Sequence, residues 1–349
     1  MQISQKKFGM FHNQEVPAIT LMNKNGISIT AIPFGASIIE WNVPDKKGRF
    51  DNIVLGFNQL DEYVQNRPYY GATVGRVAGR ISQGMFSIDG KSYQVSQNEN
   101  GNHLHGGFQG LDTKLWNFET KKRAHEASII FSCEDKNGSN GYPGNITVEV
   151  TYTLTDENEW KVAYSASTDQ PTLFNPTNHV YFNLHEDISK NILDHQLFVN
   201  ADTYAELGEN NNPTGRLLCV EDTPFDFRKT APVSQSTESE HPQAKKVKGL
   251  DHPFVLNSKT DQLDASIFDE ETGRKIEMTT DQAAVVIFLH NGKAEGYTLN
   301  GQPIEAYAGI TLETQALPDA INQKDFGDII LRPGNPYTSE TVYRFVLES

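Results

Sequence analysis

The chain has 349 residues, a formal net charge of -15, and 37% hydrophobic residues. The mean hydropathy of -0.53, with no apolar run near the ~20 residues of a spanning helix, argues against a membrane protein. The negative charge is dispersed and repels polyanions, so nucleic acid is not an expected partner, whereas a neutral substrate fits this charge.

Short segments rich in β-branched and aromatic residues predict β-strands along the whole chain. In chain order they lie at 26–43, 127–133, 145–154, 160–167 and 283–290. Turn dipeptides that favour tight hairpins recur between such segments. They are Asn25-Gly26, Asp89-Gly90, Asn100-Gly101, Asn137-Gly138, Asn291-Gly292 and Asn300-Gly301. The clearest hairpin is FSIDGKSYQV at 86–95.

Helical periodicity is scarce. Residues 59–66 predict two helical turns, and residues 318–324 predict one. The polar stretch 228–249 is rich in Ser, Glu and Lys and predicts a long surface excursion. Many strands without alternating βα units favour an all-β antiparallel sandwich or barrel, and without a clear linker we expect a single domain over 1–349.

Cysteine usage and the N-terminus indicate the compartment. Cys133 and Cys219 lie far apart and outside any CxxC pattern, so neither a disulfide framework nor a thiolate zinc site is indicated. The opening residues, MQISQKKFGM, lack the apolar core of a secretory signal. We therefore expect a cytoplasmic protein.

The segment YYGATVGRVAGRIS at 69–82 combines spaced glycines with Arg76 and Arg80. Glycines let the backbone come close to a ligand, and arginines offer fixed donors for hydroxyl or carboxylate oxygens. The segment is not a P-loop, because the Gly-Lys-Ser/Thr ending is missing. A glycine-rich turn with surface arginines is the alternative interpretation.

The stretch NHLHGG at 102–107 holds His103 and His105, which strand alternation would aim at one face. Such a pair is half of many metal sites, including that of the cupins, which add a nearby Glu. Here the first acidic residue after His105 is Asp112, so a metal site is disfavoured. We expect His103 to be structural and Gly106-Gly107 to leave room for a substrate.

The segment LFNPTNHVYFNLHED at 173–187 surrounds His179 with amides and aromatic rings. These neighbours are Asn175, Asn178, Tyr181, Phe182 and Asn183. Amides pair with hydroxyl groups and rings cover C–H faces, so this composition is typical of a sugar site. His185 lacks the second His of an HExxH motif and is expected at the surface.

In GITLETQALPDAINQ at 309–323, alternation places Thr311, Glu313 and Gln315 on one face of a strand. A Glu in an otherwise uncharged strand faces a cleft, a partner or solvent. Burial among polar neighbours would adjust its pKa for proton transfer. An exposed strand is the alternative interpretation of this segment alone.

Five motifs together, GATVGRVAGRI, NHLHGG, PTNHVYFNL, LDHPF and LETQALPDAIN, resemble the galactose mutarotase (aldose 1-epimerase) family in order and spacing. The resemblance runs from about residue 20 to the C-terminus. It implies a β-supersandwich with very little helix. It also implies interconversion of the α and β anomers of aldohexoses such as galactose and glucose, with no cofactor or metal, by a monomer or homodimer.

The resemblance also implies residue roles. Glu313 matches the general base, His179 the general acid, and His105 a residue that hydrogen-bonds at the ring oxygen. Arg80 and Asp251 match residues that hold sugar hydroxyls. Two positions depart from the pattern: Gly79 stands where many members carry Asn, and Val286 where several carry Gln. These departures concern sugar preference more than reaction type.

Other functions remain open at this point. A family member that prefers maltose or another disaccharide would share every motif. A non-catalytic carbohydrate-binding protein would share the amides and aromatic rings without needing an acid–base pair. An inverting glycoside hydrolase would require two carboxylates, for which Glu313 and Asp251 are available. A cupin-like enzyme would require a metal ion.

Overall fold

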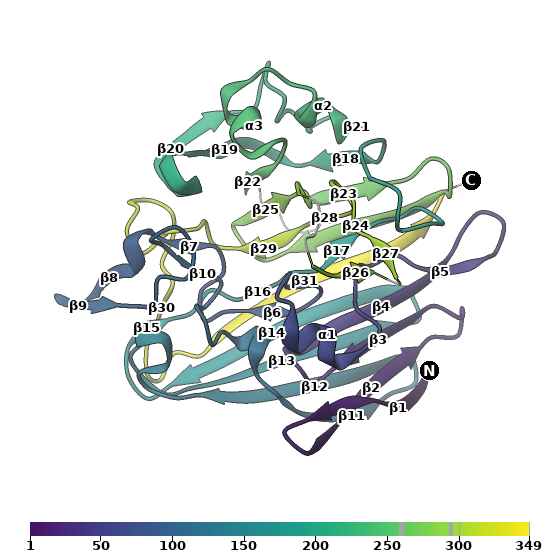
Figure 1. Cartoon of the computed structure of the whole chain (residues 1–349), viewed down its shortest axis with the longest axis horizontal. Helices are drawn as coiled ribbons and strands as arrows, with labels where there is room; N and C mark the ends of the chain where they lie inside the picture. The colour runs from purple at the N-terminus through teal and green to yellow at the C-terminus, as the bar shows by residue number, and fades with distance from the viewer. Residues whose placement is uncertain (258–261, 293–295, 300, 349) are drawn as a thin grey trace.

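The protein is described from a computed structural model, which covers residues 1–257, 262–292, 296–299 and 301–348. Asn300 of the predicted Asn300-Gly301 turn lies outside the described residues. Antiparallel sheets make up most of the fold (Figure 1). Among the described residues, no helix is long and apolar enough to cross a membrane.

The largest sheet runs through the middle of the molecule. Within the described residues it has nine strands, in the order β11 (Asn117–Lys122), β12 (Glu126–Asp135), β13 (Ile146–Thr155), β14 (Glu159–Thr168), β31 (Tyr337–Leu347), β24 (Arg274–Thr280), β23 (Ala265–Phe268), β18 (Gln196–Val199) and β21 (Ala231–Pro232). Along β13, Ile146, Val148 and Val150 are buried while the residues between them are exposed. This period of two gives the sheet one apolar face for the core.

A second sheet packs its apolar side chains against the largest one. It consists of β1 (Gln2–Phe11), β2 (Gln14–Met22), β3 (Ser28–Ile32), β4 (Ser37–Pro44) and β5 (Phe50–Asn52), drawn in purple in Figure 1. Trp41 of β4 meets Trp160 of β14 edge to face, with ring centroids 5.6 Å apart. Both indoles are fully buried, so this contact joins the two sheets at the core.

A third sheet forms the floor of the candidate site. Its strands are, in order, β20 (Pro213–Cys219), β19 (Ala201–Leu207), β22 (Asp251–Leu256), β25 (Ala284–Phe288) and β29 (Glu313–Gln315). The helices α2 (Ser234–Thr237) and α3 (Pro242–Val247) lie at the top of Figure 1, near β22.

Short two-stranded ladders and helical turns complete the fold. The ladders pair β6 (Thr73–Val74) with β16 (Thr177–Asn178), β7 (Arg80–Ile81) with β10 (His103–Leu104), β8 (Met85–Ile88) with β9 (Lys91–Gln94), β15 (Thr172–Leu173) with β30 (Ile330–Leu331), β17 (Tyr181–Phe182) with β28 (Ile310–Thr311), and β26 (Thr298–Leu299) with β27 (Gln302–Pro303). The helical turns are α1 (Leu60–Gln65), η1 (Ser82–Gly84), η2 (Leu111–Thr113), η3 (Ser139–Gly141) and η4 (Glu209–Asn211).

The structure confirms the all-β fold class, the hairpin at 86–95 and the helix at 59–66. The predicted segment 26–43 divides into β3 and β4 around a turn. Residues 318–324 form turns without a helix.

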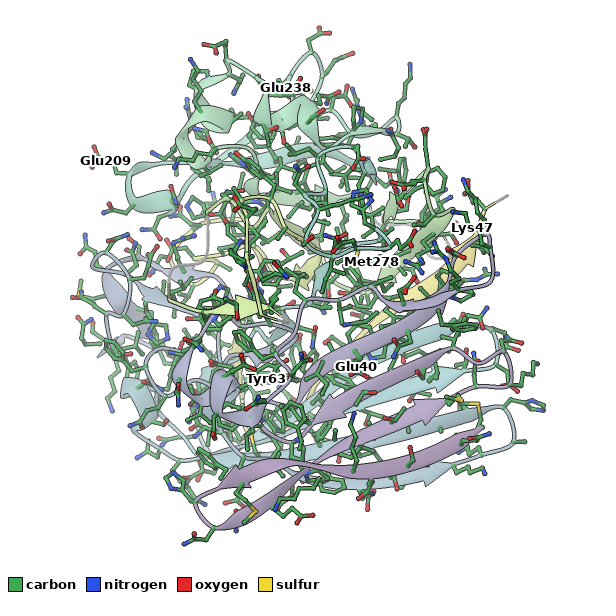
Figure 2. The ribbon with its side chains drawn as sticks, turned by 45° about the vertical axis from the view of Figure 1, so that its right-hand side comes forward. Glu40, Lys47, Tyr63, Glu209, Glu238 and Met278 are labelled. Carbon is green, nitrogen blue, oxygen red and sulfur yellow. The ribbon has the colours of Figure 1, made fainter. Side chains whose placement is uncertain are left out.

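The prediction that 228–249 forms a long surface excursion is in part wrong. It contains the two short helices α2 and α3, and both Val233, just before α2, and Ala244 of α3 are buried. Figure 2 shows Glu238, just after α2, pointing outward at the top of the molecule, while Met278 lies inside. The polar composition describes the outer face of this segment, and the few apolar residues anchor its inner face.

Candidate active site

A pocket of about 390 Å³ opens above β22, β25 and β29. All five residues expected at the site line it: Arg80, His105, His179, Asp251 and Glu313. They come from separate segments of the chain, so the fold brings together what the sequence separates by up to 233 positions, from 80 to 313.

Strand register sets the pocket floor. Glu313 of β29 pairs with Val286 of β25, and Asp251 of β22 pairs with Phe288 of β25. These four residues all line the pocket, which means that they share one face of the third sheet. Thr314, between Glu313 and Gln315, points the other way and bonds Thr341.

Glu313 and His179 form a buried pair. The distance between His179 Nε2 and Glu313 Oε1 is 3.4 Å, and the residues are 4% and 2% exposed. Burial raises the pKa of Glu313 to about 8, although a hydrogen bond from Thr311 to its carboxyl opposes this. Burial lowers the pKa of His179 to about 4. Between these values the pair holds one proton, and the two shifts favour its place on Glu313; the form with the proton on His179 differs from it by one proton transfer across the 3.4 Å between them.

His105 lies beside this pair with its ring centroid 5.1 Å from that of His179. The backbone N–H of Gly79 donates to His105 Nδ1 at 3.2 Å. Since Nδ1 is the acceptor, the proton of the neutral ring is on Nε2. Burial holds the pKa of His105 well below its usual value, so the ring is a neutral donor at neutral pH.

Arg80 and Asp251 form the polar end of the pocket. Arg80 Nη1 lies 3.6 Å from Asp251 Oδ2, and Arg80 Nη2 lies 3.0 Å from Glu99 Oε1. Glu99 thus fixes the guanidinium group, a role that the sequence did not reveal. Burial raises the pKa of Asp251, while the Arg80 charge opposes that rise. The two charged groups present both acceptors and donors to a polar ligand.

Comparisons with known proteins show which family the chain belongs to. The sequence profile of the aldose 1-epimerase family matches residues 17–344. The chain belongs to this family.

Individual relatives support the same assignment. The chain is 39% identical to human galactose mutarotase over 323 residues, 91% of each chain. It is 32% identical to the aldose 1-epimerase of Streptococcus thermophilus, over 99% of both chains. The crystal structure of galactose 1-epimerase from Lactobacillus acidophilus NCFM superposes with a TM-score of 0.90 at 30% identity, covering both chains completely. The galactose mutarotase-like fold expected from the motifs is therefore confirmed.

The sequence analysis did not single out several aromatic residues that line the pocket. Tyr69 lines the pocket with its ring 4.9 Å from that of His105 and 5.5 Å from that of His179. Its φ of 63° is in the left-handed region, which is rare for a non-glycine residue. Phe288 and Tyr297 also line the pocket. Only the adjacency of Tyr69 to the motif GATVGRVAGRI pointed to it.

His290 is a further residue that the sequence did not single out. It lines the pocket, and its Nδ1 donates to the carbonyl of Gly292 at 2.9 Å. Its Nε2 therefore accepts from the Tyr70 hydroxyl at 3.0 Å. Both ring nitrogens have protein partners, so His290 shapes the wall and has no free nitrogen for proton transfer.

Two departures from the family pattern lie directly at the pocket. Gly79 and Val286 both line it. A Cβ on Gly79 would lie 2.9 Å from the ring of Pro318, and its φ is +68°. Replacement of Gly79 therefore requires a shift of neighbouring atoms. Val286 presents an apolar surface beside Glu313.

For NHLHGG, the structure supports one expectation and corrects two others. His103 is fully buried and contacts the Ser96 carbonyl and the Tyr142 hydroxyl, both at 2.7 Å, in line with a structural role. The two histidines do not share a target, because His105 has a φ of 49° that breaks the strand alternation. The prediction that Gly106 leaves room for a substrate is wrong, because a Cβ there would lie 1.7 Å from the Gly75 carbonyl oxygen. The glycine permits close backbone packing.

The amides of 173–187 and Arg76 are structural. The side-chain amide of Asn183 donates to three backbone carbonyls, and that of Asn178 donates to the Gly71 carbonyl. Arg76 is buried and paired with Asp135 at 2.7 Å. Of the aromatic residues in this segment, Tyr181 lines the pocket.

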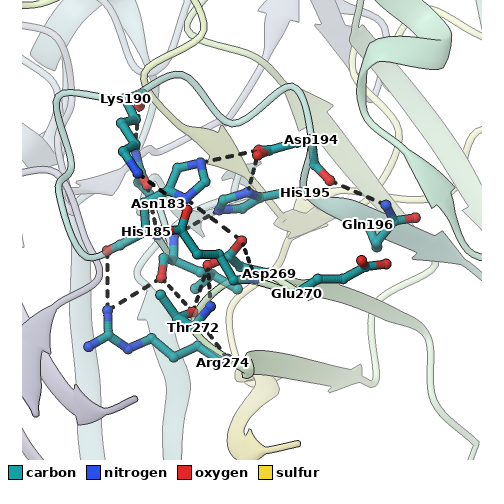
Figure 3. Close-up of polar contacts among 12 residues, drawn as sticks. Asn183, His185, Lys190, Asp194, His195, Gln196, Asp269, Glu270, Thr272 and Arg274 are labelled. Carbon is teal, nitrogen blue, oxygen red and sulfur yellow. Dashed lines mark hydrogen bonds and ion pairs between the residues drawn. The ribbon is translucent and has the colours of Figure 1, made fainter. Parts of the chain in front are cut away.

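His185 is buried, so its expected surface position is wrong. Its Nε2 lies 3.1 Å from Asp194 Oδ1, and its Nδ1 lies 3.7 Å from Asp269 Oδ1 (Figure 3). His195 bonds the Leu184 N–H through Nε2 and faces Asp194 through Nδ1. Asp194 and the Asn191 carbonyl, both 3.1 Å from Nε2, supply the polar partners that allow burial.

Within the described residues, two groups offer three possible metal ligands within 4.8 Å of one another. We call His105, His179 and Glu313 the pocket cluster, and His185, His195 and Asp269 the loop cluster. In the loop cluster, His195 Nε2 already accepts a backbone hydrogen bond and is not free for a metal. In the pocket cluster, the Nδ1 lone pair of His105 is likewise used by Gly79.

Proposed function

We propose that this protein is an aldose 1-epimerase that interconverts the α and β anomers of aldohexoses, with galactose and glucose as the first candidates. The observation that carries the proposal is the buried Glu313–His179 pair, 3.4 Å apart at the floor of a pocket large enough for a sugar. Family membership supports the reaction type. The whole chain, 1–349, is proposed to act as one catalytic domain.

Epimerisation at C1 requires two proton transfers. In the form of the pair whose one proton lies on His179, Glu313 removes the proton from the C1 hydroxyl, the C1–O5 bond breaks as a C1 carbonyl forms, and His179 delivers its proton to O5. Rotation about C1–C2 presents the other carbonyl face, and the same steps in reverse close the ring. Each positioned proton-transfer group contributes ~10²–10⁴-fold. The pair ends each cycle with its original proton count.

The remaining residues bind and orient the sugar. His105, with its proton on Nε2, donates toward O5 and stabilises the charge that develops there. Arg80 and Asp251 hold hydroxyls on the far side of the ring. The reaction as written transfers only protons and needs no metal or redox cofactor.

Several finer assignments belong to the proposal. The apolar wall at Val286 and the missing side chain at Gly79 are expected to set sugar preference, with maltose or another disaccharide as the alternative substrate. We propose a cytoplasmic monomer or homodimer. Both cysteines are free, which fits a reducing compartment.

Polarimetry tests the reaction. Fresh α-galactose, α-glucose and α-maltose should mutarotate faster with enzyme than in buffer, and His179→Asn should lower kcat by about 10²–10⁴-fold. Near-native turnover of this variant would show that His179 is not the acid.

Further assays on the same protein sample distinguish the rival functions. A purely carbohydrate-binding protein would bind sugar, measured by calorimetry, without accelerating mutarotation. An inverting hydrolase would release the leaving group from a chromogenic glycoside, and a metal-dependent cupin-like enzyme would lose activity to a chelator. Any of these results would overturn the proposal.

A further inference from the structure

Gln315 is a polar residue of the pocket that the proton transfers above do not use. It is 0% exposed and lines the pocket. It lies two positions beyond Glu313 on β29, so both side chains project from the same face of the strand. Its side-chain amide has no hydrogen-bond partner at either Nε2 or Oε1 among the described residues.

A buried amide without partners is costly, at a free energy comparable with a lost hydrogen bond or more. Two other buried amides of this protein avoid that cost: Asn183 donates to three backbone carbonyls, and Asn175 both donates to and accepts from the backbone of Ala316. Gln315 differs from them because it lines the pocket while both of its amide atoms lack a partner among the described residues. Its partner must therefore enter through the pocket.

The backbone that carries Gln315 is held in place. Asn175 clamps Ala316 through bonds of 2.9 and 3.2 Å, and Thr314 bonds Thr341 on the opposite face of the strand at 2.6 Å. Ala284, the cross-strand partner of Gln315, has a small side chain without polar atoms. The amide is thus presented from a rigid strand, which is the arrangement that selective binding requires.

We propose that Gln315 is a specificity-determining residue that hydrogen-bonds a ring hydroxyl of the aldose remote from C1; this inference rests on the proposed function. Two residues along a strand span about 7 Å, comparable with the distance across a pyranose from O1 to O4. With Glu313 at the C1 hydroxyl, Gln315 reaches the C3–C4 side of the ring. An amide both donates and accepts, which matches a hydroxyl or a pair of adjacent hydroxyls.

The test is the variant Gln315→Met, which keeps the length of the side chain and removes its polar atoms. Polarimetry on the parent aldohexose and on its 2-, 3-, 4- and 6-deoxy analogues gives kcat and KM for each sugar. We expect kcat/KM for the parent to fall about 10- to 100-fold, mainly through KM. For the 3- or the 4-deoxy analogue, wild type and variant should be nearly equal, because the bonded hydroxyl is already missing.

Gln302→Met is the matched control, because Gln302 lies exposed on β27 outside this pocket. It should leave all rates unchanged. Thermal melting adds a second readout: removal of an unpartnered amide should leave Tm unchanged or raise it, and Gln315→Leu repeats the test should Gln315→Met fail to fold.

An equal loss for every sugar, unchanged kinetics, or a lowered Tm with a proportionate loss of activity would overturn the role of Gln315. If wild type fails to accelerate mutarotation of any aldose, the proposed function itself is wrong. An active wild type with an unaffected variant refutes only the inference about Gln315.

Discussion

The pocket cluster and the loop cluster are built from the same parts. Each combines two buried imidazoles with one buried carboxylate, and each gathers its three nitrogen or oxygen atoms within 4.8 Å. They differ in what those atoms bind. Asp269 Oδ2 accepts bonds from the Thr272 N–H and hydroxyl, whereas Glu313 Oε2 has no partner among the described residues.

This difference separates a structural cluster from a reactive one. His195 of the loop cluster uses both ring nitrogens, while His179 Nδ1 and Glu313 Oε2 remain unbonded beside a cavity. His185 Nδ1 is the exception in the loop cluster, and its facing carboxylate oxygen lies 3.7 Å away. Residue type and burial are therefore not diagnostic. Unused hydrogen-bonding capacity next to a pocket is the informative feature.

The largest expected effect contrasts the two carboxylates. Glu313→Gln keeps the shape of the side chain but removes the base, so kcat should fall by about 10²–10⁴-fold. Asp269→Asn should leave kcat within about twofold and lower Tm, because a bonded acceptor of Thr272 is lost. Polarimetry and thermal melting of both variants check this. A large kcat loss in Asp269→Asn would mean that the loop cluster also serves catalysis.

The second expected effect is the pH dependence of kcat/KM, which reports the free enzyme. The pair needs one proton, with a pKa of about 4 for His179 and about 8 for Glu313. We expect a plateau from about pH 5 to 7 and a tenfold fall per pH unit above about 8, as the pair loses its one proton and none remains for O5. Asp269→Asn should show the same profile. A rate that keeps rising above pH 9 would contradict the shared-proton requirement.

Much of the pocket and its strands could be predicted from the sequence. Alternation in ITLET put Glu313 on a polar face, and the order of the motifs placed Arg80, His105 and Asp251 with it. Strand positions followed equally well, since period-two burial depends on neighbouring residues alone. These features are local or shared by a family, which is why they could be predicted.

Other features depend on contacts between distant segments. His185 stands among polar residues, and only the fold brings Asp269 to it. The left-handed backbone of Tyr69 and His105 is imposed by tertiary packing, so alternation predicted the wrong direction for the second imidazole. Whether an amide such as Asn178 or Gln315 has a partner is likewise a property of the assembled core.

A third prediction concerns stability. The folded pKa of Glu313 is about 8, above the ordinary 4.5, so its protonated carboxyl favours the folded state fully below pH 4.5, and this contribution is lost as pH rises to about 8. Glu313→Gln does not titrate. Its Tm should therefore exceed that of wild type by about 2–5 °C at pH 9, with a smaller gain at pH 5. An equal Tm difference at both pH values would show that Glu313 ionises as freely in the folded protein as in the unfolded one.

The smallest expected effect concerns Asp194, the exposed carboxylate that lies beside both histidines of the loop cluster. Asp194 lies 3.1 Å from His185 and 3.3 Å from His195, yet its side chain is 67% exposed. The hydrogen bond to His195 lowers the Asp194 pKa to about 2, so its stabilisation is present above pH 3.8 and lost as pH falls toward 2. Solvent screening reduces its size, and Asp194→Asn should lower Tm by only about 1–2 °C at pH 7. That difference should shrink between pH 5 and 3 while kcat stays unchanged. A difference that persists at pH 3 would mean that packing, and not charge, ties Asp194 to the two histidines.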